Sequence, residues 1–264
     1  MALIGQNRAS RIVHCAARAE LMPAYSGPVV ELIGGDPRYR DDHGEPSPAV
    51  ASALAAYADG SGTEHAALTA LASSRLLVPV LAMPAEETAA GAGAGAGAAA
   101  GGSQMATPSL IGRDGRRAMV AFTCADAVRR WQPAARPVPA AAAAVFGSAV
   151  ADSCAVVIDV AGPVGLVVDG ARLAALAGGG PVPRMYEDPD VWQLVATAAG
   201  RAAPGIRVRL SAPPPGAEFS LELAPPEGVP GPVPEAVAAR VADEVRELLA
   251  ERVRSAVAVV RLAG

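Results

Sequence analysis

Residues 112–139 read GRDGRRAMVAFTCADAVRRWQPAARPVP, and the elements around this stretch decide the fold. The pair Asp114-Gly115 is typical of a hairpin turn. We therefore predict two strands, over 105–112 and 116–122, joined across this turn.

A helix is predicted directly after the second strand. Thr123 and Asp126, three residues apart, resemble a capping box that opens a helix around 124–132. Trp131 lies on the same face as the apolar residues of that helix, so we expect it to anchor the helix to the core. The prolines that follow are expected to stiffen a turn into another helix over 139–150.

On the N-terminal side, Ser47-Pro48 is a good start for a helix that runs to residue 58, and a second helix is predicted over 63–74. RLLVPVLA (75–82) reads as a mostly buried strand, and Pro79 suggests a sheet edge or a bulge. The Gly/Ala run that follows, over 85–104, favours a flexible loop over a helix, because each glycine costs a helix about 1 kcal/mol.

On the C-terminal side, strands and helices are mixed without a regular βαβ order. We predict strands over 154–160, 165–169, 205–211, 218–224 and 255–262, with helices at 172–180, 190–199 and 233–253. The last helix carries an apolar stripe made of Val237, Val241, Val245, Leu248, Leu249 and Val253.

This order predicts an α+β fold with a mixed, largely antiparallel sheet packed with helices. We expect a poorly ordered tail over 1–35, an α+β domain over 36–184 that contains the Gly/Ala loop, and a smaller α+β segment over 185–264.

The composition excludes several chemistries. All 22 basic residues are arginine, so a P-loop lysine, a Schiff base and a lysine-borne prosthetic group are excluded, and we expect no cofactor. Three well-separated cysteines indicate neither a disulfide framework nor a zinc site, and they favour a reducing compartment. Since we find no signal peptide and no transmembrane run, we expect a cytoplasmic protein without membrane contact.

Arginines crowd the quoted stretch although the chain has a net charge of −4. Six arginines against Asp114 and Asp126 leave the segment at +4: Arg113, Arg116, Arg117, Arg129, Arg130 and Arg136. They could form a basic face for a protein partner or a small anion. The alternative is an ordinary solvated surface, or Arg136 pairing with a carboxylate. We expect no nucleic-acid partner, because the aromatic residues that stack on bases are scarce.

Other polar residues favour structural roles. Asp41, Asp42, His43 and Glu45 are clustered hard ligands, but their spacing matches no EF-hand, and a polar loop explains them better than a metal. Cys124 at a helix start could be a reactive thiol, but a small buried hydrophobe is the stronger interpretation. No catalytic motif of the HExxH, GxSxG or GxGxxG type occurs, and we assign no catalytic or metal-binding residue.

Three segments together resemble the SseB-like N-terminal domain family of actinobacterial proteins: DPRYRDDHGEPSPAV, LASSRLLVPVLA and the stretch from Met105 to Pro139. The resemblance covers roughly residues 36–180. Its most specific part is the series Phe122, Thr123, Ala127, Trp131, Pro133, Ala135, Arg136, Pro137, Val138 and Pro139. It implies that the strands flanking the Gly/Ala run share one sheet, and it brings no established enzymatic activity.

Two functional hypotheses follow. The first is a non-enzymatic binding or protein-interaction module that uses the arginine face. The second is an enzyme of serine or other amino-acid metabolism that uses Asp41, Asp42, His43 and Arg136, which would have to meet in one pocket. We favour the first, because no nucleophile and base can be paired from the sequence.

Overall fold

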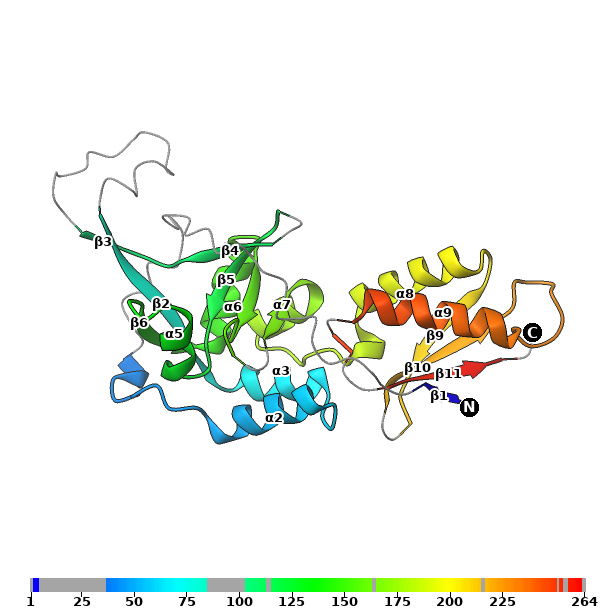
Figure 1. Cartoon of the computed structure of the whole chain (residues 1–264), viewed down its shortest axis with the longest axis horizontal. Helices are drawn as coiled ribbons and strands as arrows, with labels where there is room; N and C mark the ends of the chain where they lie inside the picture. The colour runs from blue at the N-terminus through cyan, green and yellow to red at the C-terminus, as the bar shows by residue number, and fades with distance from the viewer. Residues whose placement is uncertain are drawn as a thin grey trace. The chain divides into compact units, whose positions relative to one another are not determined.

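The computed structural model describes residues 2–4, 37–84, 103–112, 115–162, 165–214, 217–250, 252–253 and 256–262. The chain divides into two compact units, and each is described by itself (Figure 1). Unit 1 comprises Met1–Ala9, Ala53–Leu68 and Val182–Gly264, and unit 2 comprises Ser10–Ser52 and Thr69–Pro181. Strands and helices are mixed along the chain, so the fold is α+β, as predicted.

Two of the predicted segments lie largely outside the described residues. The tail expected over 1–35 lies outside the described residues, except for strand β1 (Ala2–Ile4), which the sequence did not predict. The Gly/Ala loop expected over 85–104 lies outside them as far as residue 102, and β3 begins at Ser103.

Unit 2 contains two sheets. One has the strand order β3-β2-β6 and is antiparallel, and the other has the order β4-β5-β7-β8. In the second sheet, β5 pairs antiparallel with β4 and parallel with β7, so the sheet is mixed. The strands are β2 (Arg75–Pro84), β3 (Ser103–Ala106), β4 (Ser109–Ile111), β5 (Arg117–Ala121), β6 (Arg136–Ala141), β7 (Ala155–Ile158) and β8 (Leu166–Val168).

The α-helices that precede residue 181 lie within about three residues of their predicted positions, and the short η1 was not predicted. They are η1 (Pro37–Tyr39), α2 (Pro48–Asp59), α3 (Glu64–Ala72), α5 (Ala125–Trp131), α6 (Ala142–Ala151) and α7 (Gly170–Ala177). Helix α6 begins three residues later than the predicted start at residue 139, because a strand takes the intervening residues.

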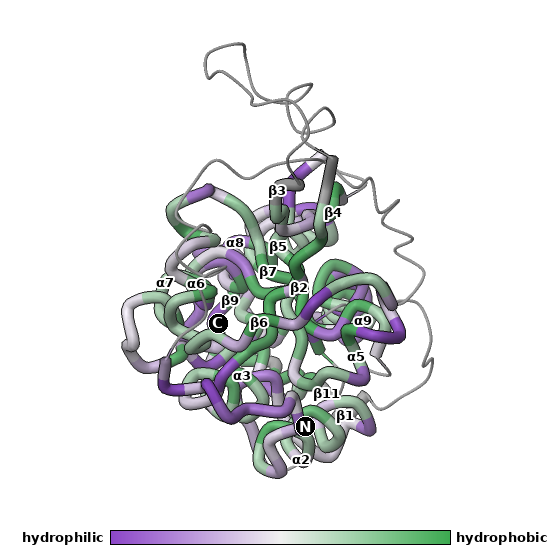
Figure 2. The backbone as a smooth tube through the Cα atoms, turned by 90° about the vertical axis from the view of Figure 1, so that its left-hand side faces the viewer, coloured by the Kyte–Doolittle hydropathy of each residue, from purple (hydrophilic) through white to green (hydrophobic). Residues whose placement is uncertain are grey.

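A reciprocal backbone pair joins the two sheets of unit 2. Leu77 of β2 donates its N–H to the carbonyl oxygen of Phe122 at 2.8 Å, and the N–H of Phe122 donates to the carbonyl oxygen of Leu77 at 2.9 Å. Leu77, Val120 and Phe122 are almost fully buried in one apolar cluster. The strands that meet at this junction, β2 and β5, are hydrophobic along the middle of the unit (Figure 2).

The stretch predicted as a turn over 136–139 is instead the strand β6. In the register of β6 with β2, Pro139 lies opposite Leu77, and Pro137 lies opposite Pro79. The N–H and carbonyl oxygen of Leu77 bond to Phe122, so the pair Leu77–Pro139 makes no hydrogen bond between β2 and β6. Because hydrogen-bonded and non-hydrogen-bonded pairs alternate along antiparallel strands, the same holds for the pair Pro79–Pro137. The prolines therefore fit an edge strand, and sequence rules that treat proline as a strand breaker failed here.

Pro79 is also placed differently from the prediction, since it lies in the central strand β2 and the pairing with β6 runs through it without a bulge. On the other side of β2, Leu77 pairs with Phe122 and pairing with β3 starts at Leu81. Pro79 lies between these two contacts, where its missing N–H leaves no pair broken.

The hairpin across residues 112–116 is confirmed. Ile111 lies opposite Arg117 in the β4–β5 register, and Gly115 has φ +78°, which a turn of this kind requires and glycine adopts readily. The single strand predicted over 105–112 is wrong, because β3 ends at Ala106 and pairs with β2, whereas β4 pairs with β5. Pro108, which cannot donate to a ladder, lies in the break between them.

The capping box predicted at Thr123 is also wrong. The N-cap of α5 is Cys124, whose side chain makes no cap hydrogen bond. The Thr123 hydroxyl is used elsewhere, as described below. Trp131, however, packs on Phe122 as predicted, with ring centroids 5.5 Å apart.

Unit 1 contains a four-stranded sheet of order β1-β11-β10-β9, in which β10 and β11 are parallel. Its other elements are η2 (Met185–Glu187), α8 (Pro189–Ala202), β9 (Arg207–Ser211), β10 (Ala217–Ala224), α9 (Glu235–Leu248) and β11 (Ala256–Arg261). Val241, Val245 and Leu249 of the predicted stripe are buried in its core, but Leu248 is exposed. Among the described helices, none is both long and apolar enough to cross a membrane.

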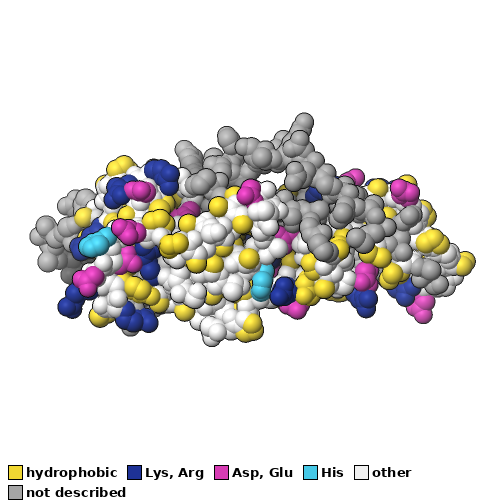
Figure 3. Space-filling view, turned by 90° about the horizontal axis from the view of Figure 1, so that it is seen from below, with side chains coloured by type: hydrophobic (Ala, Val, Ile, Leu, Met, Phe, Trp, Pro, Cys, Tyr) yellow, Lys and Arg dark blue, Asp and Glu magenta, His cyan; other side chains and the backbone are white. Residues whose placement is uncertain are grey.

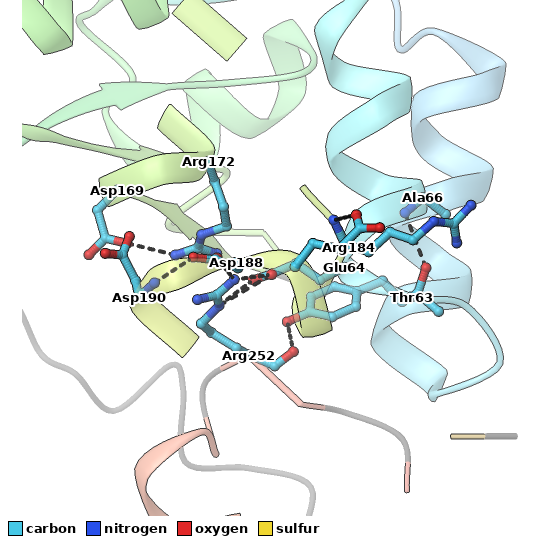
Figure 4. A network of polar contacts seen from close by, with 11 residues as sticks. Thr63, Glu64, Ala66, Asp169, Arg172, Arg184, Asp188, Asp190 and Arg252 are labelled. Atoms are coloured by element: carbon cyan, nitrogen blue, oxygen red, sulfur yellow. Dashed lines mark hydrogen bonds and ion pairs between the residues drawn. The ribbon is translucent and has the colours of Figure 1, made fainter. Parts of the chain in front are cut away.

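A largely buried arginine holds three segments of unit 1 together (Figure 4). The Arg252 guanidinium donates to both carboxylate oxygens of Glu64, at 2.9 Å for the closest contact, and to Asp188 Oδ2 at 2.7 Å. The Tyr57 hydroxyl donates to the Arg252 carbonyl oxygen at 3.1 Å. Burial would lower the pKa of Arg252, but the two carboxylates raise it. Arg252 therefore remains charged and neutralises buried carboxylates from α3 and from the N-cap of α8.

Arg252→Met should destabilise the protein by about 3–5 kcal/mol, because it leaves the buried carboxylates of Glu64 and Asp188 without a counter-charge. Urea-induced unfolding followed by circular dichroism measures the change. Arg240→Met, at an exposed position of α9, is the control and should change stability by less than about 0.5 kcal/mol. Equal stability of the two variants would contradict the role of Arg252.

Candidate functional site

The arginine surface consists of the predicted arginines that the structure describes: Arg116, Arg117, Arg129, Arg130 and Arg136. All five side chains belong to exposed residues, and the sixth, Arg113, lies outside the described residues. In Figure 3, basic and acidic side chains are interspersed toward the left-hand end of the view, the end at which Figure 1 places η1 as well as α5 and β6.

Two of these arginines, Arg116 and Arg117, flank the hairpin at the start of β5. Arg116 Nη1 lies 3.1 Å from Asp169 Oδ2, and Arg117 Nη2 donates to the Asp152 carbonyl oxygen at 3.5 Å. Both contacts are at exposed positions, so each contributes little to stability. These two guanidinium groups therefore already have partners within unit 2.

The other three arginines belong to α5 and β6. Arg129 forms an ion pair with Asp126, three residues earlier on α5. Arg130 and Arg136, which we call the turn arginines, form no ion pair within the described part of the chain. They lie on either side of the turn between α5 and β6, six positions apart in the sequence, and the charge of Arg130 also acts on the buried carboxylate of Asp159.

A buried carboxylate lies beneath the start of α5. Asp159 follows β7, is 7% exposed, and accepts hydrogen bonds from the Thr123 N–H at 2.9 Å and from the Thr123 hydroxyl at 2.6 Å. Its backbone is in the left-handed region, with φ 50°. Burial raises the pKa of Asp159, although the hydrogen bonds from Thr123 and the charge of Arg130 act in the opposite direction. Both carboxylate oxygens thus hold the chain that leads into α5.

A second polar contact fixes the loop that precedes α2. Arg75 Nε donates to Asp42 Oδ2 at 2.6 Å, and Arg75 Nη1 donates to the Thr123 carbonyl oxygen at 2.6 Å. The other oxygen of Asp42 accepts the Gly44 N–H at 2.7 Å. Burial raises the pKa of Asp42, but the hydrogen bonds from Arg75 and Gly44 outweigh it, so the net pKa is lowered. Asp42 is therefore an ionised structural anchor.

The enzyme hypothesis also named Asp41, His43 and Arg136. Within the part of the chain that the structure describes, none of these three shares a hydrogen bond with Asp42 or Arg75, whereas the backbone carbonyl oxygen of Glu45 accepts from Arg75 Nη2. Asp41, His43 and Glu45 belong to exposed positions of the loop, and Arg136 begins β6. No group of three or more His, Cys, Asp or Glu side chains among the described residues could hold a metal ion. Cys124, at the start of α5, is a half-buried free thiol.

Sequence reasoning missed Asp159, Thr123 and Arg75 as partners. The one sequence feature that could have pointed to Asp159 is its place at the end of the apolar run AVVID, where an acidic residue has to find a partner if it is buried. Nothing in the sequence indicated that the partner would be Thr123, because 35 residues separate the two positions.

Asp159→Asn should remove a pH dependence of stability. Because the pKa of Asp159 is raised in the folded protein, the folded state keeps a proton that the unfolded chain releases above about pH 4, so stability falls as pH rises through this window. Asparagine tolerates the left-handed conformation and can still accept the Thr123 N–H. The variant should therefore gain stability relative to wild type as pH rises from about 4 to 7.

Unfolding by urea at several pH values tests this. Asp126→Asn, at an exposed residue of α5, is the matched control and should follow the wild-type profile. If Asp159→Asn lost stability relative to wild type as the pH rose, burial of the Asp159 carboxylate would not be the main cause of its shifted pKa, and the prediction would be wrong.

Residues 50–175 match the family model described as SseB protein N-terminal domain. The matched range includes Arg75, Thr123, Asp159 and both turn arginines. No curated protein and no solved structure matches the chain.

Proposed function

This chain carries a domain of the SseB N-terminal domain family, and on that basis we propose that it is a non-enzymatic protein-interaction module whose arginine surface binds an acidic partner. The observation that carries the proposal is the state of the turn arginines. Arg130 and Arg136 are exposed and, among the described residues, form no ion pair. Guanidinium groups in this state can form charge-assisted hydrogen bonds with an incoming anionic group.

The local charge supports an acidic partner. From α5 to β6, Asp126 contributes −1 and Arg129, Arg130 and Arg136 contribute +3, a sum of +2, on a chain of net charge −4. A basic patch on an acidic protein attracts the complementary surface and disfavours like-charged contacts elsewhere, which orients the encounter.

The buried polar groups near the surface support a binding role over a catalytic one. Both oxygens of Asp159 accept hydrogen bonds from Thr123, and both oxygens of Asp42 accept hydrogen bonds from Arg75 and Gly44. A general base has to reach a proton on a substrate and be basic enough to take it, whereas Asp159 is 7% exposed and the pKa of Asp42 is lowered. These carboxylates are instead used to hold loops in place.

The aromatic residues support a protein partner over a nucleic acid. In unit 2, Phe122 and Phe146 are fully buried and the half-buried Trp131 packs on Phe122, whereas the exposed Trp192 belongs to α8 of unit 1 and not to the arginine surface. Single-stranded nucleic acids are bound largely by stacking of bases on exposed aromatic side chains.

We place the protein in the cytoplasm and its working domain at residues 36–184. Among the described residues, Cys124 and Cys154 form no disulfide, which fits a reducing compartment.

Reversing the charge of the arginine surface should abolish partner capture. Two double variants divide the surface: Arg116→Glu/Arg117→Glu at the hairpin, and Arg130→Glu/Arg136→Glu at the turn. Affinity purification from the native host, with bound proteins identified by mass spectrometry, should show a partner that wild type retains and at least the turn variant loses.

Arg201→Glu/Arg240→Glu is the control, because both residues are exposed on helices of unit 1. Far-ultraviolet circular dichroism establishes that each variant is folded. An identical set of bound proteins in all three variants and in wild type would refute the proposal.

A further inference from the structure

We infer that the turn between α5 and β6 recognises carboxylate side chains of an acidic protein segment through Arg130 and Arg136, by side-chain contact and not by strand addition. This inference rests on the proposed function and names the chemistry of the partner. It follows from the rigidity of the turn, from the missing donors along β6, and from the charges around the two arginines.

Several contacts hold the backbone of the turn in place and so fix the positions from which the two arginine side chains extend. Gln132 donates its N–H to the Val128 carbonyl oxygen at 2.8 Å, and Ala135 donates its N–H to the Gln132 carbonyl oxygen at 3.0 Å. Between them, Trp131 packs on Phe122, which is itself paired with Leu77. A rigid backbone lowers the entropy that is lost when a partner binds, so two arginines on it are better placed than two on a mobile loop.

The outer edge of β6 cannot accept an added strand. Pro137 and Pro139 lie opposite Pro79 and Leu77, and the backbone groups of Leu77 are committed to Phe122, so these pairs make no hydrogen bond between β2 and β6. In such pairs the backbone of Pro137 and Pro139 points away from β2. That edge then presents carbonyl oxygens at both positions and no N–H, whereas strand addition needs both. A partner must be recognised by side chains.

The charges around the turn favour carboxylates over a phosphate backbone. Arg129 is neutralised by Asp126, an exposed acid on the same helix, and Arg130 lies near enough to the Asp159 carboxylate to lower its pKa. A nucleic acid is bound by neutralising many phosphates in a row, whereas this turn offers two guanidinium groups that form no ion pair among the described residues. Two guanidinium groups match two separate carboxylates, each of which takes a guanidinium by paired hydrogen bonds.

The test compares two polyanions of equal charge, poly-L-glutamate of about 20 residues and polyuridylate of about 20 nucleotides, both fluorescein-labelled and titrated with the full chain at low salt. Wild type should bind poly-L-glutamate more tightly than polyuridylate. Arg130→Gln/Arg136→Gln should weaken poly-L-glutamate binding by about tenfold, as expected when two exposed ion pairs are lost.

Arg201→Gln/Arg240→Gln is the matched control, and its Kd for poly-L-glutamate should stay within about twofold of wild type. Tighter or equal binding of polyuridylate, or no binding of poly-L-glutamate, would overturn the inference. So would equal weakening by the two double variants. A lysate partner that depends on the arginines, together with no poly-L-glutamate binding, would leave the proposed function standing and refute this inference alone.

Discussion

The backbone pair between Leu77 and Phe122 is the constraint on which unit 2 depends. Leu77 lies in a strand whose neighbour on one side carries prolines, so its N–H and carbonyl oxygen are available to Phe122 on the other side. Buried backbone groups have to be paired, and this pair joins an antiparallel sheet to a mixed one. Helix α5, the turn and the turn arginines all follow from Phe122 along the chain, so their position depends on this junction.

Buried polar side chains reinforce the same junction. The Thr123 hydroxyl donates to the carboxylate of Asp159 at the end of β7. The Thr123 carbonyl oxygen accepts from the guanidinium of Arg75 at the start of β2. Each of these groups would be costly to bury alone, and each satisfies another. A cluster of this composition resembles a catalytic site when read as a residue list. Its hydrogen bonds join the end of β7, the start of β2 and the residue that leads into α5.

In unit 1, one largely buried arginine likewise satisfies polar groups from separate segments. Arg252 brings together α3, the N-cap of α8 and the segment before β11, and its charge compensates two carboxylates that water does not reach. Glu64 belongs to the range matched by the SseB family domain, whereas Arg252 and Asp188 lie beyond it. The family domain and the C-terminal part of this chain are therefore not separate in their stabilising contacts, because unit 1 itself contains residues of both.

Local sequence patterns were enough to predict the α+β class, the hairpin at Gly115, the helix carrying Trp131 and the buried face of α9, because periodicity and turn residues act over a few positions. They also predicted surface positions for the arginines. Contacts between distant residues, in contrast, make residues 136–141 a strand, make β5 and β7 parallel, and join Asp159 to Thr123. The reason is physical: a strand with prolines or a buried carboxylate is acceptable only when a distant partner satisfies it, and the identity of that partner is not written in the local sequence.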